Sequence, residues 1–446
     1  MLKLPALLSA LALTGCFIIE PDPVPCSIPD QCIPPPEVVE VMTITPNLDI
    51  LFVIDDSPTM IDKQRSFQNA FPALLETLSG AEGGTPNLHV GVVSSDMGTA
   101  GISDDSPAPG IGAPGQGGCM GFGKAGALQL GQAVLPDPED TFLIFDRDGS
   151  KNFEGSLAET FALQSTLGAQ GCGFEQHLTA AESALFDGKN AGFERPGANL
   201  AVIVLADEDD CSAEHTTLFG PDGGPLGPLL SFRCFRFGVE CDQEIDTLGQ
   251  KTNCRATSSE HVRAIDPFAS FLASRKPDPK RVLFGAVVGD ATTVEVESRT
   301  INGQPQIAVA PGCRFPIAGG AGEATADPGV RFHALAAGFE GRSIVESICS
   351  EDLSSAAANL GTALAGLMSE RCLPSPRAEA DCFVEDRRDA EPGIVNRLEA
   401  CSSIDGVGAN CFQIVEDFSC ASGQRLSIAR PIPAAGDEWS VLRCRE

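Results

Sequence analysis

Three uninterrupted apolar runs constrain the fold of this chain more than any other feature. They span Ile50–Ile54, Leu200–Ala206 and Val282–Val288, and none of them alternates between apolar and polar residues. A strand with one wet face alternates, whereas a strand buried on both faces does not. The runs therefore predict an α/β fold with a doubly wound, mostly parallel sheet between two layers of helices.

Two of these runs end in clustered oxygen-bearing side chains. The first leads into Asp55-Asp56-Ser57-Pro58-Thr59, and the second leads into Asp207-Glu208-Asp209-Asp210. Neighbouring parallel strands would bring Asp55 and Asp207 to one edge of the sheet, where α/β folds bind their ligands. Oxygen ligands favour Mg²⁺ or Ca²⁺, with Mn²⁺ as a third candidate, over Zn²⁺. Which acid of the second cluster faces the ion stays open.

For an isolated cluster of this kind there is a simpler interpretation. Asp55 or Ser57 would then only accept hydrogen bonds from the free backbone N–H groups of the next helix. That helix is predicted from Ile61, because apolar side chains follow at helical spacing up to Leu78. The second acidic strand end favours the metal site over the capping turn.

The first cluster resembles the metal-ion-dependent adhesion site of von Willebrand factor A (VWA) domains, which reads Asp-x-Ser-x-Ser after a hydrophobic strand. Thr59 replaces the last Ser of that motif and keeps its hydroxyl. The resemblance implies a Rossmann-like fold in which Asp55, Ser57 and Thr59 hold the cation, directly or through water, and Asp207 completes the site. A ligand carboxylate would take the remaining coordination position.

VWA domains generally supply one further Thr from the loop before the third helix. The matching region here, Gly171 to Glu175, contains no hydroxyl. Either Glu175 is a ligand in its place, or Thr166 approaches from upstream, or the site is incomplete. Longer motifs, among them Gly-Cys-Gly-Phe-Glu-Gln and Ala-Asp-Glu-Asp-Asp-Cys-Ser, resemble VWA lipoproteins of myxobacteria and related bacteria. This resemblance covers roughly residues 47–367.

The N-terminus predicts a lipid anchor. Residues 1–16 hold one Lys, an apolar core and then Leu-Thr-Gly-Cys, which resembles the lipobox of bacterial lipoproteins with Cys16 as the lipidated residue. An ordinary cleaved signal is the alternative. Residues 17–46 are rich in Pro and acids and predict a tether. Phe17 follows the Cys in place of the Asp that retains lipoproteins at the inner membrane. We therefore expect an outer-membrane lipoprotein of the bacterial cell envelope, facing the periplasm or the cell surface.

The cysteines indicate disulfides formed in an oxidising compartment. The chain has 17 Cys, and assigning Cys16 to lipid leaves sixteen, which fall in even numbers in each region: two in the N-terminal segment, eight in the middle and six in the C-terminus. Residues 371–446 hold six of them and predict a small disulfide-rich, β-rich module after a VWA-like domain at 47–370. Zinc is disfavoured, because no Cys-x-x-Cys occurs and the five His are scattered singly. No His accompanies either acidic cluster, which argues against a metal-dependent hydrolase.

The net charge of −31 argues against nucleic acid as a partner, because phosphate binding needs a basic face. A Gly-x-Gly-x-x-Gly pattern, which is typical of dinucleotide-binding loops, occurs at Gly110–Gly115. We assign it to chance in a glycine-rich loop, since no strand precedes it and no helix follows it. The expected function is binding of a protein or surface ligand that offers a carboxylate, without enzymatic activity. The alternatives are a metal-dependent hydrolase and a structural envelope protein with a degenerate metal site.

Overall fold

The computed structural model describes residues 38–80, 84–186, 188–301, 303–317, 322–339, 341–369, 371–388, 393–402, 410–418, 420–430 and 438–445. The predicted signal segment, the lipidation site Cys16, the cysteines Cys26 and Cys32 and most of the predicted tether lie outside these ranges. No helix among the described residues is both long and apolar enough to cross a membrane.

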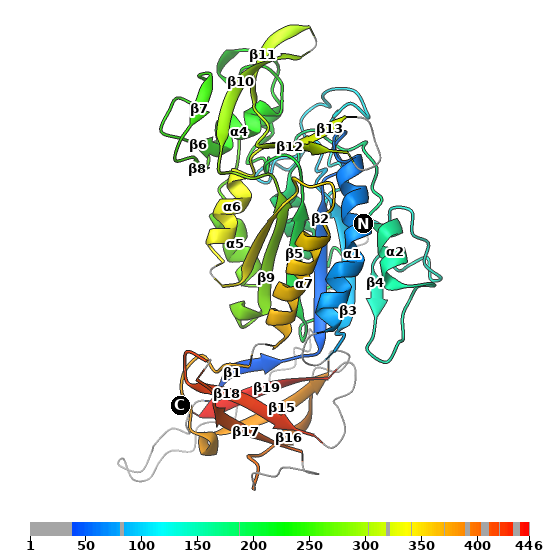
Figure 1. Cartoon of the computed structure of the whole chain (residues 1–446), viewed down its shortest axis with the longest axis vertical. Coiled ribbons are helices and arrows are strands. Elements are labelled where there is room, and N and C mark those ends of the chain that lie inside the picture. Colours follow the sequence, from blue (N-terminus) through cyan, green and yellow to red (C-terminus); the bar gives the residue numbers. More distant parts are fainter. Residues whose placement is uncertain are drawn as a thin grey trace, which may run out of the picture.

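A sheet of six strands forms the centre of the molecule, in the order β14-β9-β5-β2-β3-β4 (Figure 1). All neighbouring strands are parallel except β3 and β4, which are antiparallel. The strands are β2 (Asn47–Ile54), β3 (Asn87–Ser94), β4 (Leu143–Phe145), β5 (Asn199–Leu205), β9 (Val282–Val288) and β14 (Ser343–Ser347). Every residue of β2, β3, β5 and β9 is buried. The prediction of a mostly parallel sheet with continuous buried strands is therefore confirmed.

Helices cover both faces of this sheet, and each face has its own apolar core. One face carries α1 (Ile61–Ser79), α2 (Leu157–Gln164) and α7 (Ser354–Ser369), and the other carries α3 (His177–Leu185), α5 (Asp266–Ala273) and α6 (Val330–Ala337). On the first face, the ring centroid of Phe52 from β2 lies 5.8 Å from that of Phe67 of α1 and 4.9 Å from that of Phe161 of α2. Burial of these large side chains is what holds the helices against the sheet.

Smaller elements gather beyond the carboxyl ends of the parallel strands, at the top of Figure 1. They comprise α4 (Phe232–Gly238), β6 (Val239–Glu240), β7 (Gly249–Lys251), β8 (Arg255–Ala256), β10 (Val294–Ile301), β11 (Gln304–Val309), β12 (Cys313–Pro316) and β13 (Glu323–Ala326). Single 3₁₀ turns lie at Thr216–Phe219, Gly224–Leu226, Pro279–Arg281 and Glu379–Asp381. The helix α4 and the strands β6, β7, β8 and β10 to β13 lie beyond the same end of the sheet as the acidic strand ends.

A second, all-β unit lies at the opposite end of the central sheet (Figure 1). It contains a sheet of four strands in the order β1-β19-β15-β16 and the hairpin β17-β18. Its strands are β1 (Val38–Ile44), β15 (Cys382–Arg388), β16 (Ile394–Leu398), β17 (Cys411–Glu416), β18 (Gln424–Ala429) and β19 (Glu438–Arg445). The sequence assigned 38–44 to the tether. That boundary is corrected, because β1 pairs antiparallel with β19 and belongs to the C-terminal unit.

Seven disulfides join cysteines of the described residues, and none connects the two units. Four lie in the middle region, Cys119–Cys172, Cys211–Cys234, Cys241–Cys254 and Cys313–Cys349. Three lie in the C-terminal unit, Cys372–Cys420, Cys382–Cys444 and Cys401–Cys411. The predicted pairing within each region is confirmed for these fourteen cysteines. The small C-terminal unit depends on such cross-links because its apolar core is limited.

Candidate metal centre

The end of β2 turns sharply and places three oxygen-bearing side chains together. Asp55 extends the pairing with β5, since its N–H donates to the carbonyl of Leu205 at 3.0 Å. Its Oδ1 then accepts a hydrogen bond from the N–H of Ser57 at 2.7 Å, a turn stabilised by the Asp side chain. This turn brings the hydroxyls of Ser57 and Thr59 to 3.3 Å from each other. Asp55 and Ser57 are buried, and Thr59 is exposed.

Asp207 lies beside Asp55 because β2 and β5 are neighbours, with Ile54 paired to Leu205. The carboxylate of Asp207 is 3% exposed, and its Oδ2 lies 2.6 Å from the ammonium of Lys63. Lys63 also donates to the carbonyl of Thr59 at 3.0 Å. This lysine comes from the first turn of α1 and holds the loop after β2 against the loop after β5.

Glu175 comes from the loop before α3 and completes the group. It is 1% exposed, its carbonyl accepts the N–H of Cys211 at 2.8 Å, and its Oε1 has no hydrogen-bond partner. Thr166 has a different role, because its hydroxyl donates to the carbonyl of Ala162 and accepts from Gln68. Of the two side chains considered for this place, Glu175 is the one near Asp55 and Asp207.

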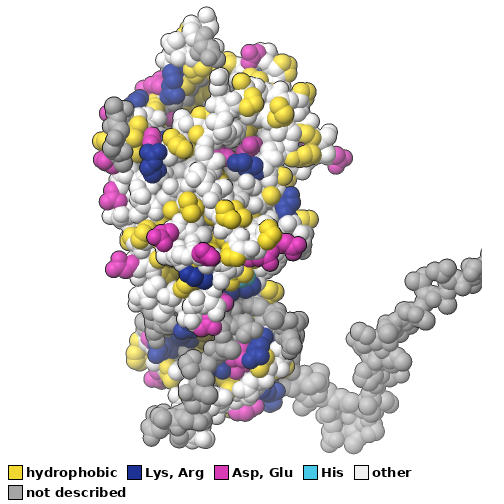
Figure 2. Space-filling view, turned by 90° about the vertical axis from the view of Figure 1, so that its right-hand side faces the viewer, with side chains coloured by type: hydrophobic (Ala, Val, Ile, Leu, Met, Phe, Trp, Pro, Cys, Tyr) yellow, Lys and Arg dark blue, Asp and Glu magenta, His cyan; other side chains and the backbone are white. Residues whose placement is uncertain are grey.

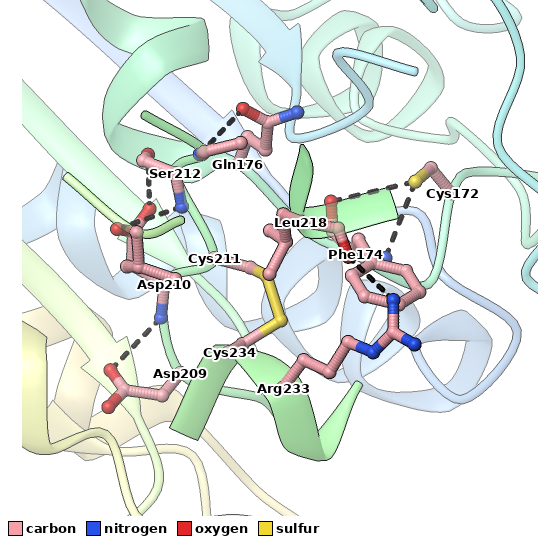
Figure 3. Close-up of a disulfide and its surroundings, with 12 residues drawn as sticks. Cys172, Phe174, Gln176, Asp209, Asp210, Cys211, Ser212, Leu218, Arg233 and Cys234 are labelled. Atoms are coloured by element: carbon pink, nitrogen blue, oxygen red, sulfur yellow. Dashed lines mark hydrogen bonds between the residues drawn. A yellow bond between two sulfur atoms is a disulfide. The ribbon is translucent and has the colours of Figure 1, made fainter. Parts of the chain in front are cut away.

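Among the other acids after β5, Asp209 and Asp210 serve the scaffold, whereas the charge of Glu208 acts on Asp55 and Glu175 and raises the pKa of both. Asp210 and Arg331 form an ion pair in which both side chains are 0% exposed, and Asp210 also accepts the N–H of Leu178 at the start of α3. Asp209 accepts the N–H of Arg331. Figure 3 shows Asp210 and Ser212 pointing toward each other beside the Cys211–Cys234 disulfide. Asp207 is thus the acid of this run that faces Asp55.

Burial and mutual repulsion raise the pKa values throughout this acidic group. Burial raises the pKa of Asp55 well above its usual value, and the charge of Asp207 raises it further. Burial likewise raises the pKa of Glu175 well above normal, with Glu208 and Asp55 adding to the effect. Burial followed by neighbouring acids raises the pKa of Glu208 to about 8. These carboxylates are stable in the charged form only if a cation compensates them.

Several polar atoms in this group are buried and have no hydrogen-bond partner. They include Asp55 Oδ2, Glu175 Oε1 and Asp207 Oδ1. The hydroxyl of Ser95, whose N–H donates to the carbonyl of Ile54 next to Asp55, also has no partner. Buried oxygens are almost always paired, so a group of unpaired ones indicates a missing ion or water. Carboxylate and hydroxyl oxygens are the donors that hard divalent cations take. The residues present therefore fit a divalent cation.

The donors do not yet converge fully on one point. Among the described residues, no three His, Cys, Asp or Glu side chains are close enough together to form a metal-ligand group by themselves. A cation here would have to draw Asp55, Glu175 and Asp207 together and use hydroxyls or water as well.

Sequence reasoning missed two side chains at this place. One is Lys63. The other is His177, whose Nε2 lies 4.0 Å from Asp55 Oδ2, so the expectation that no His accompanies the clusters is wrong. Burial lowers the pKa of His177 to about 4, although Asp210 and Asp207 oppose the shift. The sequence signal was its place two residues after Glu175, but which way a side chain at a helix start points depends on long-range packing.

A groove of about 640 Å³ reaches this group at Ser57, Thr59 and Glu175, whereas Asp55 and Asp207 do not line it. Glu208, the glycine-rich loop from Ile111 to Gly117 and the segment 229–231 line it as well. The disulfides Cys119–Cys172 and Cys211–Cys234 lie next to these two segments in the sequence. The volume lies in the range of small-ligand sites and is ample for a side chain of a partner.

No protein-family model matches the chain, and no curated protein matches it. Among solved structures, it is similar to the pilus adhesin SpaC from Lactobacillus rhamnosus GG, with 10% identity and a TM-score of 0.29 over 91% of this chain and 39% of that one. It is also similar to the human COPII-coat protein Sec24c, with 10% identity and a TM-score of 0.30 over 91% and 40%. The chain thus spans about two fifths of these structures, and both likenesses are weak.

Proposed function

We propose that this chain is a lipid-anchored protein of the bacterial cell envelope whose VWA-like domain, residues 47–370, binds a protein or surface ligand through a divalent cation. The observation that carries the proposal is the group of buried, unpaired oxygens of Asp55, Glu175 and Asp207, together with a groove that Glu175 lines. The doubly wound VWA arrangement is part of the proposal, supported by the strand order and by helices on both faces of the sheet.

In this proposal Asp55, Glu175 and Asp207 hold Mg²⁺, Ca²⁺ or Mn²⁺ together with the hydroxyls of Ser57 and Thr59. Three carboxylates would leave a divalent ion with one excess negative charge, but the ammonium of Lys63 at 2.6 Å from Asp207 offsets it. The bound cation would supply an open coordination position for a carboxylate of the ligand. Exposed Thr59 marks the side from which that carboxylate arrives.

The charge distribution supports a protein or surface ligand over nucleic acid. On the face shown in Figure 2, the described Lys and Arg side chains are scattered among Asp and Glu instead of forming one patch. Phosphate backbones need a continuous basic surface. The predicted lipid on Cys16 would provide the attachment to the membrane, and the outer membrane is the proposed location.

Calorimetry on the full chain with Mg²⁺, Ca²⁺ and Mn²⁺ tests the cation site. Wild type should give saturable heat with at least one of these ions. Asp55→Asn should lose it, because the substitution keeps the shape but removes the charge. Asp62→Asn, a partly exposed acid on α1, serves as the matched control and should bind like wild type. Equal binding heats from wild type and Asp55→Asn would contradict the assignment of the metal site.

Acidic peptides test the ligand class. Peptides containing Glu should bind in the presence of the cation and dissociate in EDTA, whereas the same peptides with Gln in place of Glu should not bind. Binding of both peptide sets, or binding unchanged by EDTA, would contradict a cation-bridged carboxylate. Turnover on phosphoester or peptide substrates would favour the hydrolase over a binding module.

The buried Lys63–Asp207 pair supports a second candidate, a structural envelope protein with a degenerate site. In that case the ammonium of Lys63 takes the place of the cation. Wild type would then give no heat with any divalent ion, and Lys63→Met would restore binding. Saturable heat from wild type would exclude this candidate.

A further inference from the structure

His177 is a buried imidazole without a hydrogen-bond partner on either ring nitrogen. It is the first residue of α3, and its side chain is 0% exposed. One of its edges packs against the ring of Phe332, with 5.2 Å between the ring centroids. The backbone carbonyl of Glu175 acts on the ring and favours its charged form, but neither nitrogen makes a hydrogen bond of normal geometry. That is unusual for an imidazole in a protein interior.

The side chain faces the acidic group. Its Nε2 lies 4.0 Å from Asp55 Oδ2, and that oxygen also has no hydrogen-bond partner. The distance is too long for a hydrogen bond between the two atoms. Two atoms that each lie about 2.1 Å from one metal ion are about 3.0 Å apart when they bind at a right angle and about 4.2 Å apart when they bind on opposite sides. One ion therefore fits between these two atoms when they bind on nearly opposite sides. The other carboxylates would have to move toward it, since the described residues hold no ready group of three His, Cys, Asp or Glu ligands.

We propose that His177 is a nitrogen ligand of the same cation and makes this site prefer a first-row transition ion over Mg²⁺ and Ca²⁺. The inference rests on the proposed cation site and extends its ligand set. Mg²⁺ and Ca²⁺ take oxygen ligands, whereas an imidazole nitrogen is a good ligand for transition metals. A set of one imidazole, carboxylates and hydroxyls therefore selects the ion by its chemistry as well as by its charge.

Electron paramagnetic resonance of Mn²⁺ bound to the full chain tests this directly. Pulsed measurements should detect the nuclear modulation of a directly bound ¹⁴N in wild type. They should not detect it in His177→Leu, which keeps an apolar side chain of similar volume beside Phe332. His261→Leu, a substitution outside the site, should keep the modulation. Competition should show that wild type prefers Mn²⁺ to Mg²⁺ by at least about tenfold and that His177→Leu loses most of this preference.

The outcomes separate this inference from the proposed function. If Mn²⁺ binds in a manner that depends on Asp55 but shows no ¹⁴N modulation, the cation site stands and the role of His177 is overturned. A wild-type preference for Mg²⁺ over Mn²⁺ would also overturn it. If Mg²⁺ or Ca²⁺ binds but Mn²⁺ does not, the inference fails and the cation site stands. If none of the three ions binds, both fail. Because the wild-type spectrum alone decides the ligand question, misfolding of His177→Leu would not obscure the result.

Discussion

Asp207 divides its two carboxylate oxygens between two roles. Its Oδ2 lies 2.6 Å from the ammonium of Lys63, whereas its Oδ1 has no hydrogen-bond partner. The first oxygen is neutralised within the protein, and the second is available to an ion. Lys63 therefore competes with a cation for the charge of the site while keeping the apo form folded, because an unpaired buried carboxylate is strongly destabilising.

Replacing Lys63 by Met should change binding and stability in opposite directions. Without the competing ammonium, the affinity for a divalent cation should rise by about tenfold, which is about 1.4 kcal/mol. The apo protein should lose about 3–5 kcal/mol of unfolding free energy, the usual effect of breaking a buried pair. Calorimetry and denaturant unfolding measure the two effects. Lys124→Met is the control, since Lys124 pairs with Asp56 outside the proposed ligand set. A weaker affinity in Lys63→Met would show that Lys63 supports the site instead of competing.

The raised pKa values predict how stability depends on pH. Burial raises the pKa of Asp327 to about 7 and that of Glu208 to about 8. A carboxyl with a raised folded-state pKa stabilises fully below its unfolded pKa and loses that stability as pH rises through the folded one. His177 acts in the opposite sense, because burial lowers its pKa to about 4 and its unfolded form titrates near 6.5. Its contribution is nearly constant only above about pH 7.5, so the decrease caused by the carboxyls is clearest there.

In EDTA, the melting temperature of the chain should therefore fall between pH 6.5 and 8.5, by about 2 °C or more for a domain of this size. A bound divalent cation should remove most of this decrease, because it compensates the carboxylates. Thermal melts across the pH range, with and without the cation, measure it. A melting temperature that rises with pH in EDTA would contradict the electrostatic account.

The helix α3 is fixed at its start by residues far away in the sequence. Its preceding residue Gln176 gives no side-chain cap, but Asp210 accepts the N–H of Leu178 and Ser212 accepts the N–H of Thr179. Asp210 is held in turn by the buried guanidinium of Arg331. The same start of the helix carries Glu175 and His177, so the caps position two of the proposed ligands.

Arg331→Met should therefore destabilise the protein and weaken cation binding together. Loss of one partner of a fully buried pair costs about 3–5 kcal/mol. The control is Arg255→Met, because Arg255 pairs with Glu240 on the surface, where an ion pair contributes about 0–1 kcal/mol. Denaturant unfolding and calorimetry check both effects. If Arg331→Met is destabilised but binds the cation with unchanged affinity, the Asp210–Arg331 pair stabilises the fold without positioning the proposed ligands.

The central elements could be predicted because their signals are local. The continuous apolar runs at Ile50–Ile54 and Leu200–Ala206 indicate strands buried on both faces. The sequence of α1 places apolar residues at helical spacing, which indicates a helix with one buried face. Asp55 and Asp207 followed from the strand ends. The roles of Lys63 and His177 could not be predicted, because they depend on which way side chains at helix starts point once distant loops pack on them. The pairing of β1 with β19 was missed for the same reason, since it joins opposite ends of the chain.

At the scale of the whole molecule, strand β1 and the proposed site lie at opposite ends of the described structure (Figure 1). The chain enters through β1 in the C-terminal unit and passes directly into β2, whose far end carries Asp55 (Figure 1). An anchor that precedes β1 would hold the C-terminal unit toward the membrane and point the groove away from it. This arrangement suits presentation of the groove to a partner.

The strand β1 should be needed for the stability of the C-terminal unit. It buries Val41 and Met42 and covers one edge of β19. A chain that begins at Asn47 should be cleaved within 371–446 at least about tenfold faster than one that begins at Val38, since burial of two apolar side chains contributes about 3 kcal/mol or more. Limited proteolysis with mass spectrometry measures this, and cleavage within the central domain is the internal control. Equal cleavage rates would show that the disulfides suffice without β1.

The most direct test of the cation site is a crystal of the full chain soaked with Mn²⁺ and measured for anomalous scattering. We predict one strong anomalous peak within bonding distance of Asp55, Glu175 and Asp207, about 2.0–2.3 Å from their oxygens. The peak should be absent from crystals of Asp55→Asn soaked in the same way. An ordered acidic group with no peak at saturating Mn²⁺, or a peak elsewhere only, would contradict the account.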